Sequence, residues 1–435
     1  ISHHITSMTR FIVEGGHRLS GSITPSGNKN EALPVLAALL LTTEPVVLSN
    51  LPKIRDITMM CELLTSLGVR ITELGPHQLR FDAASLSSST PEFGKASQIR
   101  GSFLLAAPLL ARLGAANLPA PGGDKIGLRP VSTHLQALRG LGAWIETDGE
   151  DNIYRMQSSG FHGADLHLDE ASVMATENAL MAAVLASGTT TIYNAACEPH
   201  VQGLCHFLNT LGANITGIGT NLITVTGVSR LHGGEYTLQP DHIEVGSFIG
   251  LAAVTRSELC IRNAAVPHLR MTRMMFDRLG VETRVQGKDL HVPGDQKLAV
   301  QVDTPGGIPK IDDGPWPAFP ADLTSIMTVT ATQCRGAVLI FEKMFESRLF
   351  WVDKLIAMGG QIILCDPHRA VVSGPSPLRG APVSSPDIRA GMALLIAALG
   401  AQGISEIHNV QQIDRGYERI DERLNAIGAH IQRLD

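Results

Sequence analysis

The stretch MMCELLTSLGVR, residues 59–70, decides the fold, because its pattern returns five more times along the chain. Apolar side chains at helical spacing lead to a Leu-Gly-Val corner, and a short strand pattern follows. Glycine directly after a helical pattern is the usual helix C-cap. The equivalent glycines are Gly68, Gly142, Gly212, Gly280, Gly359 and Gly428. Their spacings of 74, 70, 68, 79 and 69 residues indicate six copies of one supersecondary unit.

The other half of each unit repeats as well. A long apolar helical pattern comes first, and a turn marked by Gly or Pro and a β-branched strand pattern follow, as in residues 189–194. The six apolar helices are expected over residues 31–41, 102–113, 176–186, 246–255, 323–332 and 389–399. Helices that alternate with strands predict an α/β fold. Six units divide naturally into two domains of three.

Length and composition agree with two globular domains. A chain of 435 residues exceeds one ordinary hydrophobic core, and its 44% hydrophobic and 17% charged residues are typical of a globular protein. The net charge of -6 argues against a nucleic acid or an anionic membrane as partner, and no apolar run reaches transmembrane length. Small anions stay possible as ligands, because a few arginines in one cleft hardly change the net charge.

The cysteines indicate a reducing compartment. They lack CxxC pairing and lie in apolar segments, which favours buried free thiols: Cys61, Cys197, Cys205, Cys260, Cys334 and Cys365. Residues 1–7 resemble a vector-derived remnant and are left out of the fold prediction. We expect a cytoplasmic protein that needs neither a metal ion nor a cofactor.

Charged side chains gather at equivalent places in the six units. The loops after the strands contain Arg55-Asp56, Asp124 with Arg129, Glu198, Glu346 with Arg348, and Asp414-Arg415. The starts of the apolar helices contain Lys29-Asn30, Arg100, Ser172, Glu244, Asp322, and Asp387 with Arg389. One such residue is more often an ordinary cap or a solvated charge. Polar or charged residues at all six helix starts favour an anion site, because helix N-termini present free N–H groups and the positive end of the dipole.

Six longer motifs occur in a fixed order along the chain. They are SGNKN (26–30), IRGS (99–102), PGGDKIGLRP (121–130), PAFPAD (317–322), FESR (345–348) and DRGYER (414–419). In these motifs, and from about residue 8 to residue 435, the chain resembles the enolpyruvyl transferase family, most of all the branch acting on UDP-N-acetylglucosamine. The resemblance implies a two-domain inside-out α/β barrel of six βαβαββ-type repeats. Residues 8–28 and 240–435 would form one domain, and residues 29–239 the other, with a mobile loop around residues 121–129.

The resemblance also implies a reaction. The enolpyruvyl group of phosphoenolpyruvate passes to the 3-hydroxyl of UDP-N-acetylglucosamine with release of phosphate, the first committed step of peptidoglycan synthesis. The hydroxyl adds to C2 of phosphoenolpyruvate while C3 is protonated, and loss of phosphate and a C3 proton leaves the enol ether. Such chemistry requires a base near the hydroxyl and an acid near C3. In the family these roles belong to the positions of Asp322, after the proline-bounded turn 317–320, and of Asp124.

Phosphoenolpyruvate carries a phosphate and a carboxylate, so its site requires converging cations. By resemblance, the residues that bind it are Lys29, Asn30, Arg129, Arg389 and Arg415, of which Lys29 and Arg415 also count as catalytic. A guanidinium suits bidentate contact with an anion, whereas lysine supplies a compact charge. Surface ion pairing is the ordinary alternative, above all for Arg389.

Position 124 departs from the usual family pattern. Most members have a cysteine there, which serves as proton donor and as the thiol that fosfomycin alkylates, whereas this chain has Asp124. A carboxylic acid can donate a proton in a desolvated site, but a carboxylate attacks an epoxide slowly. We therefore expect an active enzyme that is insensitive to fosfomycin.

The acceptor half departs further. Met174 stands where the family usually has glycine, Glu170 where some members have lysine, Ser132 in place of an aspartate, and His200 in place of an acid. The positions that match acceptor contacts are Asn30, Arg100, Arg129, Pro130, Val131, Ser132, Thr133, His134, Ser172, Val173, Asp322 and Met344. These departures do not affect the residues expected to bind phosphoenolpyruvate, but they leave the identity of the acceptor open.

Two other functions remain open at this point. A paralogue would use another nucleotide or UDP-sugar acceptor, in secondary metabolism or surface polysaccharide synthesis. A non-catalytic binding protein would not require Asp322 and Asp387 together with the cations at positions 29, 129, 389 and 415. The expected partners are the small-molecule substrates, with neither nucleic acid nor membrane, and the sequence does not indicate an oligomeric state.

Overall fold

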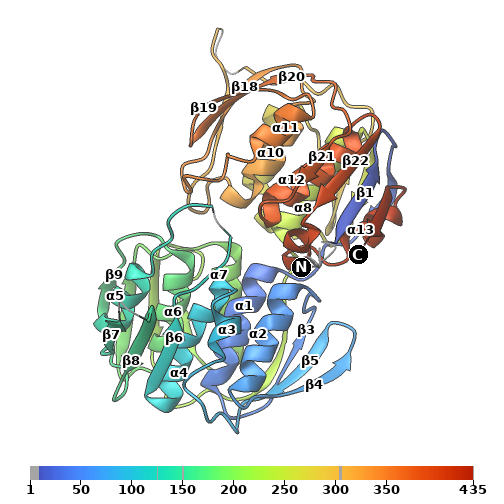
Figure 1. The fold of residues 1–435 in the computed structure, drawn as a ribbon. Helices are drawn as coiled ribbons and strands as arrows, with labels where there is room; N and C mark the ends of the chain where they lie inside the picture. Colours follow the sequence, from blue (N-terminus) through green and yellow to red (C-terminus); the bar gives the residue numbers. More distant parts are fainter. Residues whose placement is uncertain (1–8, 125, 149–150, 303–305, 435) are drawn as a thin grey trace, which may run out of the picture. The chain divides into compact units, whose positions relative to one another are not determined.

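The computed structural model describes residues 9–124, 126–148, 151–302 and 306–434 (Figure 1). The chain forms two compact units, each with its own hydrophobic core. Unit 1 comprises the described part of Ile1–Ser26, then Asp124–Leu128 and Pro240–Asp435; unit 2 comprises Gly27–Gly123 and Arg129–Gln239. The short segment Asp124–Leu128 thus groups with unit 1, although both of its flanks belong to unit 2. Residues 1–7, the expected remnant, lie outside the described residues.

One succession of elements recurs: a strand, a buried helix, a second strand parallel to the first, another helix, and an antiparallel hairpin. In the clearest copy, β9 (Asp165–His167) pairs in parallel with β10 (Thr189–Tyr193), and β12 (Leu222–Thr226) joins β10 antiparallel with β11 (Asn214–Thr216) outside it. This is the βαβαββ repeat, and the α/β class expected from the sequence is confirmed.

Unit 2 contains three such repeats around sheets β13-β3-β5-β4, β6-β8-β7 and β11-β12-β10-β9. The first is β13 (Gly234–Thr237), α1 (Lys29–Ala38), η1 (Leu39–Leu41), β3 (Val46–Ser49), α2 (Arg55–Ser66), β4 (Arg70–Gly75) and β5 (Gln78–Asp82). The second is α3 (Phe93–Ala96), η2 (Arg100–Leu105), α4 (Ala106–Leu113), β6 (Ala115–Pro119), α5 (Ser132–Gly140), β7 (Trp144–Asp148) and β8 (Ile153–Gln157). The third adds α6 (Val173–Ala183) and α7 (Pro199–Thr210) to β9–β12.

Unit 1 contains three more, around sheets β15-β16-β14-β2, β17-β18-β20-β19 and β21-β22-β1-β23. The first is β2 (Ser20–Ile23), α8 (His242–Thr255), β14 (Glu258–Ile261), η3 (Val266–His268), α9 (Arg270–Arg278), β15 (Arg284–Gln286) and β16 (Asp289–Val292). The second is β17 (Lys310–Asp312), η4 (Ala321–Leu323), α10 (Thr324–Ala331), β18 (Gly336–Phe341), α11 (Val352–Ala357), β19 (Gln361–Asp366) and β20 (Arg369–Gly374). The third is β21 (Pro382–Ser384), α12 (Ile388–Gly400), β22 (Ile404–His408), η5 (Val410–Arg415), α13 (Ile420–Asn425), β23 (His430–Leu434) and β1 (Arg10–Glu14).

The six corner glycines behave as the sequence predicts. Each follows the second helix of its repeat and has a positive φ, between 77° and 107°. A residue with a side chain is strained in this left-handed region, so the glycines turn each helix into its hairpin at little cost.

The first helix of each repeat lies inside its unit. In unit 1, α8, α10 and α12 pack against one another with the strands around them (Figure 1), and every residue of α8 is buried. A helix that is apolar on all sides requires such a position, since it has no face for water. In unit 2, α1, α6 and the η2–α4 segment take the equivalent places. No helix in the described part of the chain is long and apolar enough to cross a membrane.

The second repeat differs from the others because its described sheet has three strands. The segment that would supply the first strand lies beside β6, where the backbone N–H of Asn117 donates to the carbonyl of Ser89 at 2.9 Å. Pro91 follows two residues later. Proline has no N–H to continue a ladder, so the segment does not extend into a strand.

All six cysteines are free, but not all are buried. Burial raises the pKa of the Cys61, Cys205 and Cys334 thiols to about 12. The expectation of burial is wrong for Cys365, which is exposed, and holds only in part for Cys61 and Cys260, which are half-buried. Cys365 lies on the outermost strand of its sheet, β19, where the pairing with β20 shifts register between Leu364 and Asp366.

Candidate active site

Asp322 lies in η4, the turn that opens the buried helix α10 of unit 1. Nη2 of Arg348 donates to Oδ1 of Asp322 at 3.0 Å, and Nε of Arg389 donates to Oδ2 at 3.0 Å. The aspartate side chain is 27% exposed, whereas those of Arg348 and Arg389 are 4% and 5% exposed. Two fixed cations therefore orient a carboxylate that solvent still reaches.

Arg389 is itself held in place at the start of α12. Asp387 caps this helix and accepts from the backbone N–H groups of Arg389 and Ala390 at 2.9 and 3.0 Å. Burial lowers the pKa of the Arg389 guanidinium, but the charge of Asp322 more than offsets this, so the pKa lies above its usual value. Nη1 of Arg389 is buried and makes no hydrogen bond within the described residues. This guanidinium has one donor left for an anion.

A second carboxyl group lies behind Arg348. Glu342, which follows β18, is fully buried, and its Oε2 lies 3.9 Å from Nε of Arg348. Burial raises the pKa of Glu342 to about 9, although the charge of Arg348 acts in the opposite direction. Burial therefore favours the neutral form of this carboxyl group. The FESR motif contains Arg348, but the sequence pattern indicates it only as a loop charge.

Asp124 and Arg415 form an ion pair. Nη1 of Arg415, at the end of η5, donates to Oδ1 of Asp124 and to Oε1 of Gln412, the latter at 2.9 Å. Their side chains are 13% (Arg415) and 18% (Asp124) exposed. Two residues expected to be catalytic thus meet in unit 1.

Glycine allows the loop around Asp124 to lie close to its neighbours. The backbone N–H of Ser347 donates to the carbonyl of Ile126 at 3.0 Å. A Cβ on Gly127 would lie 2.2 Å from Oε2 of Glu346, and Gly127 has a φ of +140°. A larger residue would push this segment away from the 346–347 backbone. Lys125 lies outside the described residues.

Lys29 opens helix α1 in unit 2. Asn28 caps this helix and accepts from the backbone N–H groups of Asn30 and Glu31 at 2.9 and 3.3 Å. Nζ of Lys29 lies 2.8 Å from Oδ2 of Asp56, and the two side chains are 9% and 6% exposed. Asp56, which the sequence indicates only as a loop charge, thus fixes the lysine, while Asn30 is half-buried.

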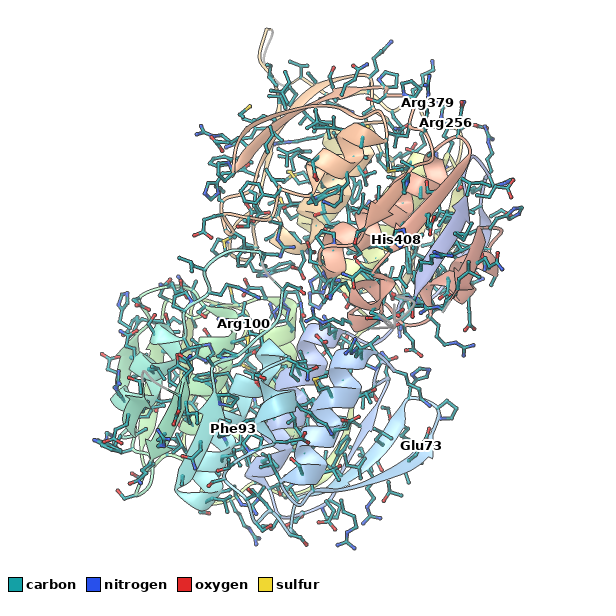
Figure 2. All side chains as sticks on the ribbon, viewed as in Figure 1. Glu73, Phe93, Arg100, Arg256, Arg379 and His408 are labelled. Carbon is teal, nitrogen blue, oxygen red and sulfur yellow. The ribbon has the colours of Figure 1, made fainter. Side chains whose placement is uncertain are left out.

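Arg100 supports the backbone that follows the glycine loop (Figure 2). Its Nη2 donates to the carbonyls of Arg129 and Pro130 at 2.7 and 3.4 Å. Burial, and then the positive charge of Arg129, lowers the pKa of Arg100 to about 10, while Glu170 acts in the opposite direction. Arg100 therefore positions residues 129–130, with Glu170 as a nearby negative charge.

The expected acceptor residues at the start of α5 differ in accessibility. Ser132 is exposed, but Thr133 is buried and donates to Oδ1 of Asp169 at 2.6 Å. His134 is also buried, and Nδ2 of Asn178 donates to its Nδ1 at 2.9 Å. Burial, then the charge of Arg100, lowers the pKa of His134 to about 3, so its imidazole is neutral. Pro130 is exposed, and Val131 is buried.

The start of α6 offers backbone groups instead of a capping side chain. Ser172 occupies the cap position without a side-chain hydrogen bond to the helix, and its backbone N–H donates to the carbonyl of Glu170 at 2.8 Å. Val173 and Met174 are half-buried. In unit 1, Met344 is 40% exposed, and its backbone N–H donates to Oδ2 of Asp313 at 3.3 Å.

Comparison with known proteins identifies the family of the chain. A family model described as EPSP synthase (3-phosphoshikimate 1-carboxyvinyltransferase) matches residues 13–424. The UDP-N-acetylglucosamine 1-carboxyvinyltransferase of Bradyrhizobium diazoefficiens is 58% identical over 98% of each chain. The proteins of the same name from Treponema pallidum and Bacteroides fragilis are 54% and 51% identical, covering 98% of this chain and 99% and 100% of theirs.

Solved structures share the fold. The enolpyruvyl transferase NikO from Streptomyces tendae has a TM-score of 0.88 at 24% identity, covering 98% of this chain and 99% of its own. EPSP synthase from Acinetobacter baumannii has a TM-score of 0.75 at 18% identity, covering 99% and 100%. At these identities the likeness shows the architecture alone.

Proposed function

The chain belongs to the EPSP synthase family, and from this we propose that it transfers the enolpyruvyl group of phosphoenolpyruvate to the 3-hydroxyl of UDP-N-acetylglucosamine, with release of phosphate. The observation that carries the proposal is the 58% identity, over 98% of both chains, to a relative named for this activity. We place the reaction in the cytoplasm, as the first committed step of peptidoglycan synthesis.

The donor is bound by fixed cations. We assign phosphoenolpyruvate binding to Lys29, Asn30, Arg129, Arg389 and Arg415. The buried pair with Asp56 holds Lys29 in one position, and the unused Nη1 of Arg389 is a donor for a phosphate or carboxylate oxygen. Groups that are already oriented lose little conformational entropy when the anion binds.

Asp322 is assigned as the base. Its carboxylate accepts the hydrogen bond of the acceptor hydroxyl and takes the proton as oxygen bonds to C2 of phosphoenolpyruvate. Two guanidinium groups hold this carboxylate, which makes it a weak base but a precisely oriented one. C3 receives a proton in the same step, and the product is a tetrahedral phospho-ketal. Elimination then breaks the bond from C2 to the phosphate oxygen and returns one C3 proton to the enzyme.

Asp124 is assigned as the acid that serves C3. A carboxylate bonded to Arg415 has no proton to give, so the pair seen in unit 1 must open before the addition step. The anionic donor is suited to open it, because its phosphate or carboxylate competes with Asp124 for the same guanidinium. Once released into a desolvated site, the carboxyl group can hold a proton.

The acceptor is assigned to the starts of α5 and α6. The exposed Ser132 and the backbone N–H groups after Ser172 suit the polar atoms of a nucleotide and its diphosphate. His134 and Thr133 are buried behind this surface and support it. Glu170, Met174, Ser132 and His200 differ from the usual pattern, so a related UDP-sugar or nucleotide is the second candidate acceptor.

Acceptor-dependent release of phosphate tests the proposal. The purified protein receives phosphoenolpyruvate alone, or with UDP-N-acetylglucosamine, other UDP-sugars or 3-phosphoshikimate, and phosphate is measured over time. We expect release with UDP-N-acetylglucosamine only. Release with a different acceptor would replace the substrate assignment, and no release with any acceptor would overturn the enzymatic function.

A further inference from the structure

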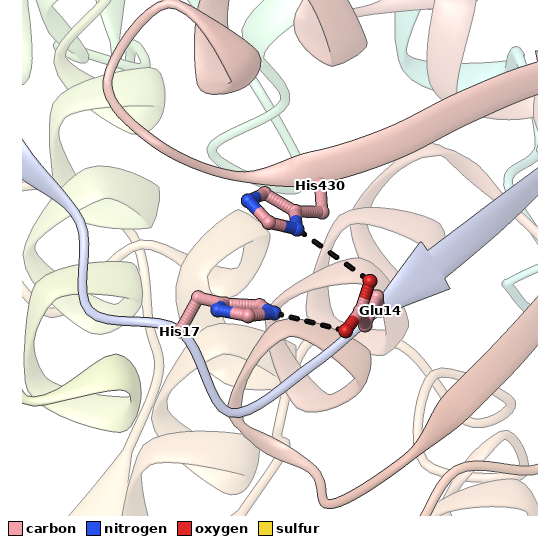
Figure 3. A group of neighbouring side chains, drawn as sticks. All are labelled: Glu14, His17 and His430. Atoms are coloured by element: carbon pink, nitrogen blue, oxygen red, sulfur yellow. Dashed lines mark ion pairs between the residues drawn. The ribbon is translucent and has the colours of Figure 1, made fainter.

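Three side chains from the two ends of the chain converge at one edge of unit 1, outside the candidate active site (Figure 3). Glu14 ends strand β1, His17 follows in the next loop, and His430 begins strand β23. In the antiparallel pairing of these strands, Glu14 lies directly opposite His430. The fold thus brings together residues that are more than 400 positions apart in the sequence.

The distances are those between ligands of one metal ion. Nε2 of His17 lies 3.3 Å from Oε1 of Glu14, and Nδ1 of His430 lies 3.5 Å from Oε2. One ligand atom from each residue lies within 4.8 Å of the other two. Nitrogen and oxygen ligands at 2.0–2.1 Å from a tetrahedral ion are roughly 3.4 Å apart. Only small side-chain shifts are needed to place one ion among the three.

Nε2 of His17 lies beside the carboxylate of Glu14 (Figure 3). Nε2 is buried and, within the described residues, makes no hydrogen bond; Glu14 lies near but outside hydrogen-bond geometry. A buried polar atom usually has a partner. The rings of His17 and His430 are stacked, with centroids 4.0 Å apart. A neutral imidazole nitrogen is the form that binds a metal ion.

We propose that Glu14, His17 and His430 form a binding site for a divalent transition-metal ion of the zinc class. Two imidazoles and a carboxylate suit Zn²⁺, Co²⁺ or Ni²⁺, whereas Mg²⁺ and Ca²⁺ prefer oxygen ligands alone.

The site is open to solvent, and it connects the first strand to the last. The side chains of Glu14, His17 and His430 are 57%, 39% and 54% exposed, so an ion can enter directly. Glu14 and His430 also line a hollow of about 330 Å³, which leaves room for water as a further ligand. An ion bound here ties β1 to β23 and binds the folded chain preferentially, so it stabilises unit 1.

Zinc titration with matched variants tests the proposal. All proteins carry His3→Ala and His4→Ala, so that the N-terminal histidines do not bind the probe. The Zn²⁺ affinity is measured by competition with a chromophoric chelator for the wild-type site, His17→Ala, His430→Ala and His408→Ala. His408 is the control because it lies on β22 of the same sheet (Figure 2), with its Nε2 3.4 Å from Glu406 but without a third ligand among the described residues.

We expect one Zn²⁺ to bind per chain. Its affinity should fall more than about 100-fold in either His17→Ala or His430→Ala, because loss of a residue that only supports a ligand already costs 10–100-fold. The affinity should stay unchanged in His408→Ala. Co²⁺ should give a visible absorption band that the same two variants remove. His430 is half exposed, so His430→Ala decides the outcome if His17→Ala folds poorly. Equal affinity of wild type and His430→Ala, or an equal loss in His408→Ala, would overturn the site.

Discussion

Asp322 and Asp124, the two candidate catalytic aspartates of unit 1, both pair with arginine, but they are held in different ways. Asp322 lies at the start of a buried helix between two buried arginines, and the buried Glu342 lies behind one of them. Asp124 lies on a glycine-rich segment and forms an ion pair with Arg415. One carboxylate is held by two buried arginines at the start of a helix, whereas the other lies on a loop and must leave Arg415 before it can act as an acid.

The difference corresponds to the two roles proposed for them. A base that must meet a hydroxyl in one geometry gains from a rigid support, because orientation lowers the barrier without cost at the moment of reaction. An acid that starts as a paired carboxylate must instead give up its partner and acquire a proton. Rigidity would hinder the second group as much as it helps the first.

The largest effect is expected when the fixed carboxylate is removed. Asp322→Asn should lower kcat by about 10²–10⁴, the usual contribution of a general base. The amide keeps the size of the side chain, so circular dichroism should stay unchanged. Asp353→Asn is the matched control, because the ion pair that Asp353 forms in the described part of the chain is with Lys354, on the surface of α11. Phosphate release near the wild-type rate from Asp322→Asn would remove Asp322 from the mechanism.

The second test exchanges the movable carboxylate. The wild-type protein should resist fosfomycin, whereas Asp124→Cys should be inactivated in a time-dependent way and keep carboxyvinyl transfer within about 10-fold, because a thiolate attacks the epoxide far faster than a carboxylate. Residual activity and intact-protein mass measure both outcomes. The exposed Cys365 is the internal control, since an adduct there would appear in the wild type too. An active but unmodified Asp124→Cys would show that residue 124 does not reach C3.

A smaller effect is expected from the support of the fixed carboxylate. Arg348→Lys keeps the charge but loses the geometry of the guanidinium, so kcat should fall roughly 10- to 100-fold while KM changes little. In Arg348→Met, kcat should fall further. The acidic limb of its kcat–pH profile should also move to higher pH, because Asp322 loses one stabilising cation. A uniform loss of both kcat and folded protein, with an unchanged pH profile, would mean that Arg348 only supports the fold.

Local patterns in the sequence predict the repeats well. The six corner glycines have the expected backbone because the capping requirement is local and recurs in every unit. The partner of a given side chain is not predicted by such local patterns. Arg348 and Asp322 are 26 residues apart, and nothing in the FESR motif indicates that its arginine would bind this carboxylate.

The burial of particular residues also could not be predicted from the sequence. His134 matches an acceptor position, but α5 turns its ring toward Asn178, and only the packing of α5 on α6 reveals this. Glu14 and His430 meet through strand register, which depends on the two ends of the chain joining one sheet. These features arise from tertiary contacts between distant segments, which residue periodicity does not encode.

The smallest expected effect concerns Glu342 and the pH dependence of stability. Burial raises the pKa of Glu342 from 4.5 to about 9. Between these values the unfolded chain releases the proton while the folded chain keeps it, so the stability of unit 1 falls as pH rises through this window. Above about pH 9 both states are ionised, and the decline from this group ends. Glu342→Gln removes the proton exchange and should flatten the profile.

Hydrogen exchange of α10, in unit 1, measures how the free energy of unfolding changes between pH 5 and pH 8.5. The exchange rates are corrected for the intrinsic effect of pH, and α6 in unit 2 serves as an internal reference. Relative to wild type, Glu342→Gln should gain about 4 kcal/mol between the two ends of the range. The buried amide carries its own cost, but that cost does not vary with pH, so the slope is the test. Glu258→Gln, on the exposed side of β14, should leave the slope unchanged. If stability depends on pH in the same way in Glu342→Gln and in the wild type, Glu342 is ionised behind Arg348. Asp322 would then be supported by an ionic network instead of a cation backed by a neutral acid.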